Sequence, residues 1–234
     1  ALSWTCYFFA LTHLEPSIVN TLHSGMGPLT VIALAECGVR LARPSVIGRQ
    51  EALGYAAIAL SLVGLWWVVL SGQSGLPHAD PVASLIGLAL VLVSGVSITV
   101  SLLFSKRLHD HGVSPEAVTA VRYLALILRA GCVVAWQGRL TGIGDLRDLV
   151  ALSLIATVLI ALPTFALQIG VARTAPLTAH VLRSLGPVCV FGVQQLDGRL
   201  VYSMPPLICI LGYSAAAIAS NIAHGWREQP AAMR

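Results

Sequence analysis

The sequence predicts an all-α protein, a bundle of transmembrane helices built from two inverted repeats. Three observations lead to this fold class. Hydrophobic residues make up 56% of the chain and charged residues only 10%, whereas soluble domains are about 25% charged. Apolar runs close to the ~20 residues needed to cross a bilayer recur along the chain. One of these runs, with its polar residues, is repeated about 160 residues further on.

Eight apolar segments are expected to form helices. The first begins inside an apolar run and resembles the end of a helix. The second starts at Ser17 after Pro16, and serine is a residue type that caps helix N-termini. Turn-forming residues at 71–81 and a glycine-containing polar loop at 138–148 separate later segments. No connection could hold a soluble domain. The expected spans are 1–13, 17–37, 52–71, 82–104, 115–137, 149–171, 177–197 and 205–224.

The repeated segment has the same frame in both copies. A proline is followed by a polar residue four positions on, a basic-type residue three further, a serine, and then Gly-Pro. Leu53-Gly54-Tyr55 is matched in the same way by Leu211-Gly212-Tyr213. Such internal repetition in an apolar chain is typical of transporters with two related halves. The copies are Pro16, Asn20, His23, Ser24 and Gly27-Pro28, then Pro176, His180, Arg183, Ser184 and Gly186-Pro187.

This repeat divides the chain into two parts. Residues 1–75 would be the remainder of a first repeat, with helices three to five, and 76–234 a second repeat, with helices six to ten. The second part has three spans before its copy and the first part has one. We therefore expect about two helices to be missing at the N-terminal end. Five helices per repeat is an odd number, so the two halves would be inverted.

Basic residues are distributed unevenly between alternate loops, eight on one side and three on the other. Cytoplasmic loops carry the excess of Lys and Arg. The larger group therefore predicts a cytoplasmic C-terminus in a multi-pass protein of the inner or plasma membrane. The cytoplasmic group is Arg40, Arg43, Arg49, Lys106, Arg107, Arg173, Arg227 and Arg234, and the other group is Arg139, Arg147 and Arg199.

The polar residues of the two copies are the main candidates for a substrate site. On 17–37, Asn20, His23, Ser24 and Gly27 lie along one helical stripe, and the second copy has a similar stripe. His23 and His180 are suited to hydrogen-bonding a substrate or to carrying a proton. Packing between helices is the alternative for all these polar groups. The prolines inside the two spans, Pro28 and Pro187, are expected to kink their helices.

Arginines inside the spans favour a substrate with negative charge. Arg183 lies about two turns inside its span, where an ionisable group is costly and marks a functional site. Arg129 lies near the middle of its span, where a lone cation costs ~3 kcal/mol or more. Arg122 is on the same face but nearer the end, where it could snorkel. Either missing helices or an anionic or zwitterionic substrate would supply the counter-charge. Gln168 is a weaker candidate for lining the same path.

Other classes of site have little support in the sequence. The five cysteines are far apart and contain no C-x-x-C pair, so neither a disulfide framework nor a zinc site is expected. The motifs H-E-x-x-H and G-x-S-x-G are missing, which argues against an intramembrane enzyme. The scattered basic residues do not predict nucleic-acid binding. We expect no metal and no cofactor.

A family resemblance covers the whole chain, and most of the motifs that carry it lie in the second half. The order Ala161-Leu162-Pro163, Ala172-Arg173-Thr174-Ala175-Pro176, Ser184 with Gly186-Pro187, and Leu196-Asp197-Gly198-Arg199-Leu200 resembles the EamA-type transporters of the drug/metabolite transporter superfamily. The acidic residue that these place beside glycine has degenerate counterparts here, Ala35-Glu36 and Asp197-Gly198. The resemblance implies ten helices in two inverted halves, a central cavity, and gradient-driven export of small metabolites.

These observations predict a secondary active transporter that exports amino acids or related anionic or zwitterionic compounds by alternating access. Alternatives are a nucleotide-sugar or drug transporter of the same fold, or a non-transporting intramembrane receptor or enzyme. The expected partners are a small-molecule substrate and the lipid bilayer. A small-residue face formed by Gly212, Ala215-Ala216-Ala217 and Ser220 suits close helix packing or a homodimer contact.

Overall fold

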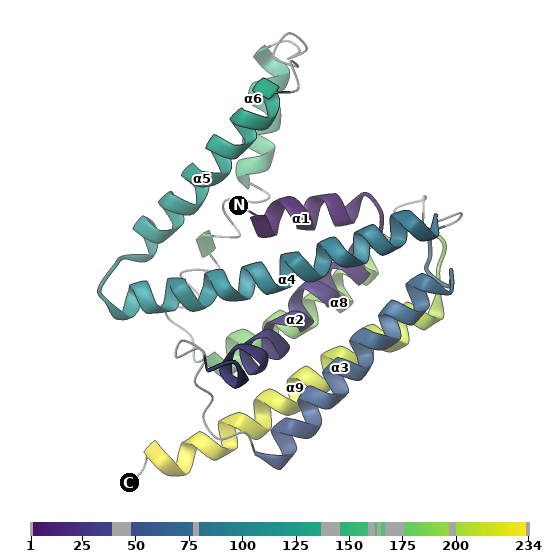
Figure 1. Cartoon of the computed structure of the whole chain (residues 1–234), viewed down its shortest axis with the longest axis vertical. Helices are drawn as coiled ribbons and strands as arrows, with labels where there is room; N and C mark the ends of the chain where they lie inside the picture. Colours follow the sequence, from purple (N-terminus) through teal and green to yellow (C-terminus); the bar gives the residue numbers. More distant parts are fainter. Residues whose placement is uncertain are drawn as a thin grey trace. The chain divides into compact units, whose positions relative to one another are not determined.

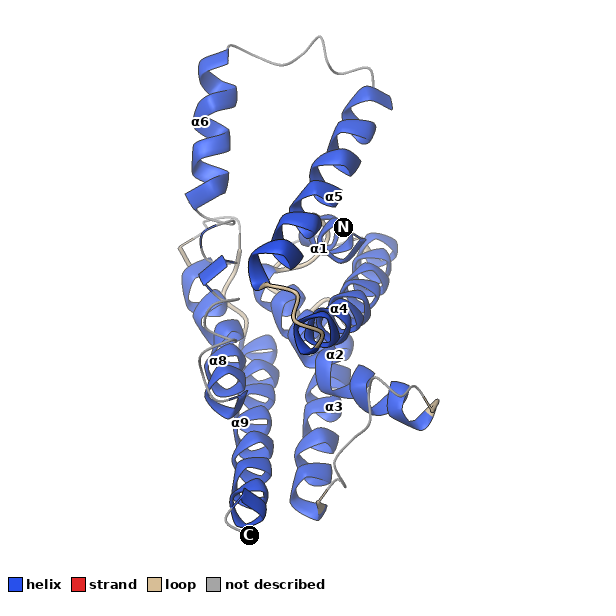
Figure 2. Ribbon diagram, turned by 90° about the vertical axis from the view of Figure 1, so that its left-hand side faces the viewer, coloured by secondary structure: helices blue, strands red, loops and turns tan. Residues whose placement is uncertain are grey.

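The computed structural model describes residues 2–38, 48–76, 80–136, 146–158, 162, 165–166, 176–196 and 200–232. Helices are the regular elements drawn in this part of the chain (Figures 1 and 2). The predicted all-α class is therefore confirmed for the described residues. The elements are α1 (Leu2–Leu11), α2 (Pro16–Glu36), α3 (Arg49–Leu70), α4 (Pro81–Asp110), α5 (Pro115–Trp136), α6 (Leu146–Ala156), α8 (Pro176–Gln194) and α9 (Met204–Ala232).

Two helices run further than the apolar runs that predicted them. α4 continues past 104 to Asp110, and α9 continues past 224 to Ala232. Helical hydrogen bonds are formed within the segment itself, so a helix can extend into polar residues beyond an apolar run. α6 covers the first part of the predicted span 149–171, and most of the remainder lies outside the described residues.

Among the residues that the structure describes, four helices are long and apolar enough to cross a membrane. They are the segments Pro16–Glu36, Arg49–Leu70, Pro81–Ser105 and Met204–Ala223. Side chains on their outer faces are apolar and strongly exposed, as on α3, where Leu60 is 73% and Trp67 is 70% exposed. Large exposed apolar surfaces of this kind indicate contact with a membrane or another apolar partner. The lengths and surfaces are consistent with a membrane protein.

Prolines and glycines mark many of the helix boundaries. Proline has no N–H to leave unpaired in the first turn, and its fixed φ suits that position. A glycine with positive φ follows the ends of α2, α3 and α4, where the chain must leave the helix in a left-handed conformation. The N-terminal prolines are Pro16, Pro81, Pro115 and Pro176, and the glycines are Gly38, Gly72 and Gly112, with φ of 75°, 69° and 82°.

The chain forms two compact units, each of which has its own internal packing. The larger unit comprises Leu2–Phe104 and Leu177–Arg234, and the smaller comprises Ala1 with Ser105–Pro176. The larger unit therefore takes helices from both predicted repeats. The repeat boundary at 75/76 is defined by sequence similarity rather than by packing, and it stays a prediction.

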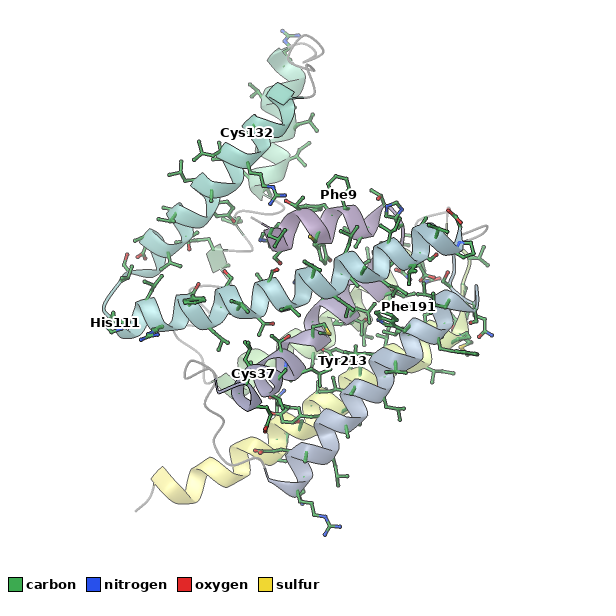
Figure 3. All side chains as sticks on the ribbon, viewed as in Figure 1. Phe9, Cys37, His111, Cys132, Phe191 and Tyr213 are labelled. Carbon is green, nitrogen blue, oxygen red and sulfur yellow. The ribbon has the colours of Figure 1, made fainter. Side chains whose placement is uncertain are left out.

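α2 lies at the centre of the larger unit. Its buried side chains Ile18, Val19 and Leu22 are each 0% exposed and belong to a core shared with α1, α3, α4, α8 and α9. A Cβ on Gly25 would lie 2.7 Å from Cδ2 of Leu62 on α3. Further core members are Ala10, Leu14, Ile58, Leu62, Leu65, Val69, Leu88, Val91, Phe191, Ile210, Tyr213, Ala216 and Ala217. Figure 3 labels Phe191 and Tyr213 of this core, and also Phe9 of α1, which is 59% exposed.

α3 and α9 lie side by side (Figure 1), and small residues of both helices lie at their contact. A Cβ added to Gly54 would lie 2.6 Å from Cβ of Ser220, and one added to Gly212 would lie 3.2 Å from Oγ of Ser61. These two contacts show that the helices run antiparallel. The small-residue face of α9 therefore serves packing within the chain, one of its two predicted uses. A homodimer stays a prediction.

The smaller unit contains the end of α4 together with α5 and α6. Apolar side chains on the described faces of α5 are exposed, among them Val121 at 67% and Ile127 at 67%. Val118 and Thr119, in the first turns of α5, are buried. This unit has less buried apolar surface among its described residues than the larger one. α5 shows that Pro115–Trp136 of the predicted span 115–137 is helical, and its crossing of a membrane stays a prediction.

Candidate functional site

The polar stripe predicted on α2 is present, and its members are half-buried. Each residue of the stripe, Asn20, His23, Ser24 and Gly27, has intermediate exposure. Between them in the sequence, Thr21, Leu22 and Gly25 are buried. A Cβ on Gly27 would lie 3.8 Å from Oγ1 of Thr99 on α4, so this helix face approaches α4. The structure thus places the stripe at a helix crossing within the larger unit.

His23 is hydrogen-bonded into this crossing. Its Nδ1 lies 3.0 Å from Oγ of Ser94 on α4. Ser94 is 0% exposed, and its hydroxyl donates to the backbone oxygen of Ser3 on α1 at 2.7 Å. The Ser3 hydroxyl in turn donates to the backbone oxygen of Ser94 at 3.0 Å. One network therefore connects α1, α2 and α4, and we call Ser3, His23 and Ser94 the His23 network.

The geometry also assigns the tautomer of the imidazole. A serine hydroxyl has one proton to donate, and that of Ser94 is directed at the Ser3 carbonyl. Ser94 Oγ must therefore accept from His23, so Nδ1 carries a hydrogen. In a neutral ring, Nε2 is then the acceptor atom. Such fixed orientation by a second residue is typical of functional histidines, although it also serves purely structural ones.

Aromatic side chains of α1 lie beside this network. The Tyr7 ring packs edge-on against His23, with ring centroids 5.0 Å apart. Trp4 packs edge-on against Tyr7 at 5.9 Å and stacks on Phe8 at 5.8 Å. Edge-to-face and offset rings at these distances attract each other beyond the burial of their area. α1 therefore takes part in this site in two ways. Tyr7 contacts the His23 ring, and Ser3 exchanges hydrogen bonds with Ser94.

Asn20, one turn before His23, approaches α8. A Cβ on Gly186 would lie 3.7 Å from Nδ2 of Asn20. Gly186 and Pro187 form the Gly-Pro pair of the second copy, and Pro187 is fully buried. Pro28 and Pro187 both lie inside their helices, as predicted. The two repeated segments are therefore in contact, with the polar residue of one beside the Gly-Pro of the other.

The remaining predicted site residues are placed less completely. His180 and Arg183 lie on α8 and Arg122 on α5, but their side chains are not among those described. Gln168 lies outside the described residues. Arg129 is on α5 in the smaller unit, where its side chain is exposed. The role of these five residues in a substrate site stays a prediction.

A second polar cluster was not predicted from the sequence. Glu15 directly precedes α2 and is only 2% exposed. Its Oε1 accepts a hydrogen bond from the backbone N–H of Gly75, and its Oε2 accepts one from Nε2 of Gln194 at 3.2 Å. We call Glu15, Gly75 and Gln194 the Glu15 cluster. Gln194 also accepts from the backbone N–H of Ser17 at 3.0 Å.

The environment of Glu15 changes its acidity. Burial raises the pKa of this carboxyl above its ordinary value, and the hydrogen bonds from Gly75 and Gln194 partly offset the increase. Removing a carboxylate from water disfavours its charged form, whereas donated hydrogen bonds favour it. The only local signal in the sequence is an acidic residue directly before a helix that starts with proline. Such a residue is usually a solvated one beside the positive end of the helix dipole.

Two buried hydroxyls of α2 have no hydrogen-bond partner within the described part of the chain. They are Oγ of Ser17 and Oγ1 of Thr30. Among the residues searched, no group of three His, Cys, Asp or Glu side chains could hold a metal ion.

No family model, curated protein or solved structure matches this chain.

Proposed function

We propose that this protein is a secondary active transporter that moves small polar metabolites across a membrane, with its substrate path at the His23 network. One observation carries the proposal. A half-buried histidine of a membrane-length helix is hydrogen-bonded to a serine of α4, and this serine is itself bonded to α1. Ionisable residues inside membrane-spanning helices are costly, and most line substrate or proton paths.

The contact between the two repeated segments supports the same proposal. Asn20 of the first segment lies beside Gly186 of the second. In transporters built from inverted repeats, the substrate binds between corresponding helices of the two halves. His180 and Arg183, on the first turns of α8, would complete the path, and Arg183 would hold an anionic group. Arg129, Arg122 and Gln168 belong to the smaller unit, and their part in binding a substrate stays a prediction.

Packing of α3 against α9 supports the inverted repeat. Gly54 and Gly212 are the glycines of the two matched Leu-Gly-Tyr segments. Gly54 approaches Ser220 on α9, while Gly212 approaches Ser61 on α3. This reciprocity is what a local two-fold axis between corresponding helices requires. We therefore keep the proposal of two inverted five-helix halves, with the division at 75/76 and a cytoplasmic C-terminus.

The resemblance to EamA-type transporters agrees with these features and implies export of amino acids or related compounds. Anionic or zwitterionic substrates suit the arginines predicted on α5 and α8. The His23 network joins the hydroxyls of Ser3 and Ser94 to one imidazole, and these groups can hydrogen-bond a polar substrate. Transport is therefore the function that the site supports best.

The test is efflux from proteoliposomes containing the purified protein. Vesicles are loaded with a panel of amino acids and related anions, and efflux is measured with and without a pH gradient. We expect saturable efflux of one class and its loss in His23→Ala at unchanged protein abundance. His111→Ala is the matched control, because His111 follows α4 in the smaller unit and is exposed. Well-folded protein that moves no member of the panel would reject the proposal.

A structural role for His23 gives a different result. If the imidazole only holds α2 against α4, His23→Ala should lower abundance and efflux in equal proportion. His23→Gln would then restore both, because its amide can still donate to Ser94. If the imidazole acts on substrate or proton, His23→Gln should restore abundance without restoring efflux. The two roles therefore differ in the ratio of efflux to abundance, which can be measured.

A further inference from the structure

Each repeated segment carries a proline inside its helix, and in α8 this proline is compensated by a neighbouring helix. Proline has no N–H, so it removes one helical hydrogen bond and disturbs the bonds beside it. Pro187 lies inside α8. Three residues before it, the carbonyl of Ser184 accepts a hydrogen bond from the hydroxyl of Ser214 on α9 at 2.8 Å. Both serines are buried, with 3% and 4% exposure, so a residue of this chain supplies a donor where the proline weakens α8.

The corresponding place in α2 has no such donor. Pro28 leaves the carbonyl of Ser24, four residues earlier, without its helical N–H. The residue that matches Ser214 in the repeated Leu-Gly-Tyr segment is Ala56, which has no hydroxyl and is exposed on α3. Within the described ranges, no side chain and no loop N–H donates to the Ser24 carbonyl. The two copies therefore differ, and α2 keeps an acceptor without a donor.

Two polar side chains lie along the same line of α2. Asn20, Ser24 and Pro28 follow one another at four-residue intervals, within the polar stripe that also contains His23. The side chains of Asn20 and Ser24 are half-buried, and neither is hydrogen-bonded to another described residue. Accessible polar groups on a membrane-length helix are tolerated where they line a cavity or path. We call the Ser24 carbonyl and the side chains of Asn20 and Ser24 the Pro28 break.

We propose that the Pro28 break binds the positively charged amino group of the substrate, and that the transported compounds are therefore α-amino acids. This inference rests on the proposed transport function and narrows its substrate class. Anions without an amino group, which the arginines alone would also accept, are excluded as preferred substrates.

The chemistry of the Pro28 break selects a cation that donates hydrogen bonds. The Ser24 carbonyl, the Ser24 hydroxyl and the amide oxygen of Asn20 are all acceptors, and an ammonium group has three donors. The carbonyl also belongs to the C-terminal end of the first half of α2, where the helix dipole is negative. In transporters with interrupted helices, such half-helix ends and freed carbonyls hold cations. A carboxylate would be repelled at the same place.

The carboxylate of an amino acid would bind to the other repeated segment. Asn20 lies beside α8, with 3.7 Å between its Nδ2 and a Cβ built on Gly186. Arg183 is three residues before Gly186 in the same helix, and in the proposed function it holds the anionic group. An α-amino acid carries its ammonium and its carboxylate on one carbon atom. It can therefore contact both repeated segments at once.

Binding of matched compounds tests the proposal in the parent protein. The purified protein in nanodiscs is titrated with alanine, leucine, phenylalanine and glutamate, and with the hydroxy acids that have a hydroxyl in place of the amino group: lactate, 2-hydroxyisocaproate, phenyllactate and 2-hydroxyglutarate. We expect at least one amino acid to bind, and to bind about tenfold or more tightly than its hydroxy acid, as for hydrogen bonds to a charged group. Equal binding within every pair, tighter binding of the hydroxy acids, or no binding of any amino acid would overturn the proposal.

Pro28→Ala removes the acceptor in a defined way. Alanine supplies the missing N–H, so the Ser24 carbonyl regains its helical bond and is no longer offered to a ligand. We expect the preference for the amino acid over its hydroxy acid to fall about tenfold. Pro187→Ala is the matched control, because it removes the same kind of proline from α8, and it should leave the preference unchanged. An equal loss in both variants would reject the Pro28 break as the recognition site.

Asn20→Leu is the second variant if Pro28→Ala does not fold. Leucine has a similar size and no acceptor, so the preference should fall again, and a full preference would reject the proposal. A sodium ion is the competing occupant of the same oxygens. Titrations in which choline replaces sodium distinguish it, since a preference that disappears without sodium would assign the Pro28 break to the metal ion and overturn the ammonium site.

Efflux from proteoliposomes then separates the two proposals. Amino acids that bind with the expected preference but are not moved would keep the ammonium site and reject transport. Saturable efflux of amino acids and hydroxy acids with equal half-saturating concentrations would keep transport and reject the ammonium site.

Discussion

The close approach of α3 to α9 makes a strong prediction about Gly54. Replacing Gly54 with alanine would place a Cβ 2.6 Å from Cβ and 3.1 Å from Cα of Ser220. Real Cβ atoms are not found so close to carbon, and the Cα of Ser220 is backbone that moves only with α9. We therefore expect Gly54→Ala to force the two helices apart, although neither residue carries charge or takes part in the proposed site.

The magnitude follows from two opposing terms. Adding a methyl group to a filled interface costs about 1–3 kcal/mol. Alanine is better than glycine in a helix interior by about 0.5–1 kcal/mol, which acts in the other direction. The matched control is Gly192→Ala on α8, where an added Cβ meets nothing within 4 Å. Relative to this control, Gly54→Ala should be less stable by about 1–3 kcal/mol, since the helix term is common to both.

The assay is reversible unfolding in mixed micelles, followed by far-UV circular dichroism or tryptophan fluorescence. A second substitution, Ser220→Gly, removes the Cβ of residue 220, which is the atom nearest to the methyl group introduced by Gly54→Ala. The double variant should therefore regain part of the lost stability. Double-variant cycles isolate this coupling between touching residues. Equal stability of Gly54→Ala and Gly192→Ala, or additive losses in the double variant, would refute the packing of α3 on α9 described above.

Two further predictions address the His23 network and the orientation of the chain. Ser94→Ala removes the acceptor of His23 Nδ1 and should destabilise the protein by about 0.5–1.5 kcal/mol in the same unfolding assay. Ser97→Ala, on the same helix but half-buried, should have a smaller effect, and equal effects would show that the hydrogen bond contributes nothing. Cys37 is exposed after α2, and the basic residues that follow it predict that it lies on the cytoplasmic side. In intact cells it should therefore react with a membrane-permeant maleimide and not with an impermeant one. Labelling by the impermeant reagent would reverse the proposed orientation.

The helices themselves were predictable because their causes are local. Apolar runs of the right length, with proline at the first position and glycine just after the end, indicate helices without knowledge of their neighbours. The polar stripe of α2 could be predicted for the same reason, since residues three and four apart share one helix face. His23 was accordingly a candidate before any contact was known.

The partners of His23 could not be predicted in the same way. Ser94 is 71 residues from His23, and Ser3 is 91 residues from Ser94. A serine in an apolar helix is most often a small packing residue, and nothing local distinguishes one that accepts from a histidine. The burial of Glu15 is a second feature that could not be predicted from the sequence. Its sequence context is that of a solvated turn, and its burial depends on Gly75 and Gln194.

The sequence by itself determined the helical class, membrane-length segments and the internal repeat, because helical hydrogen bonds join residues only four apart. Tertiary structure decided which faces meet. It turned the small residues of α9 toward α3, set His23 against Ser94, and buried the carboxyl of Glu15 beneath the connection after α3. These contacts join residues that are distant in the chain, and they form where two helix surfaces fit closely together. A local sequence pattern contains no information about which distant surface will pack against it.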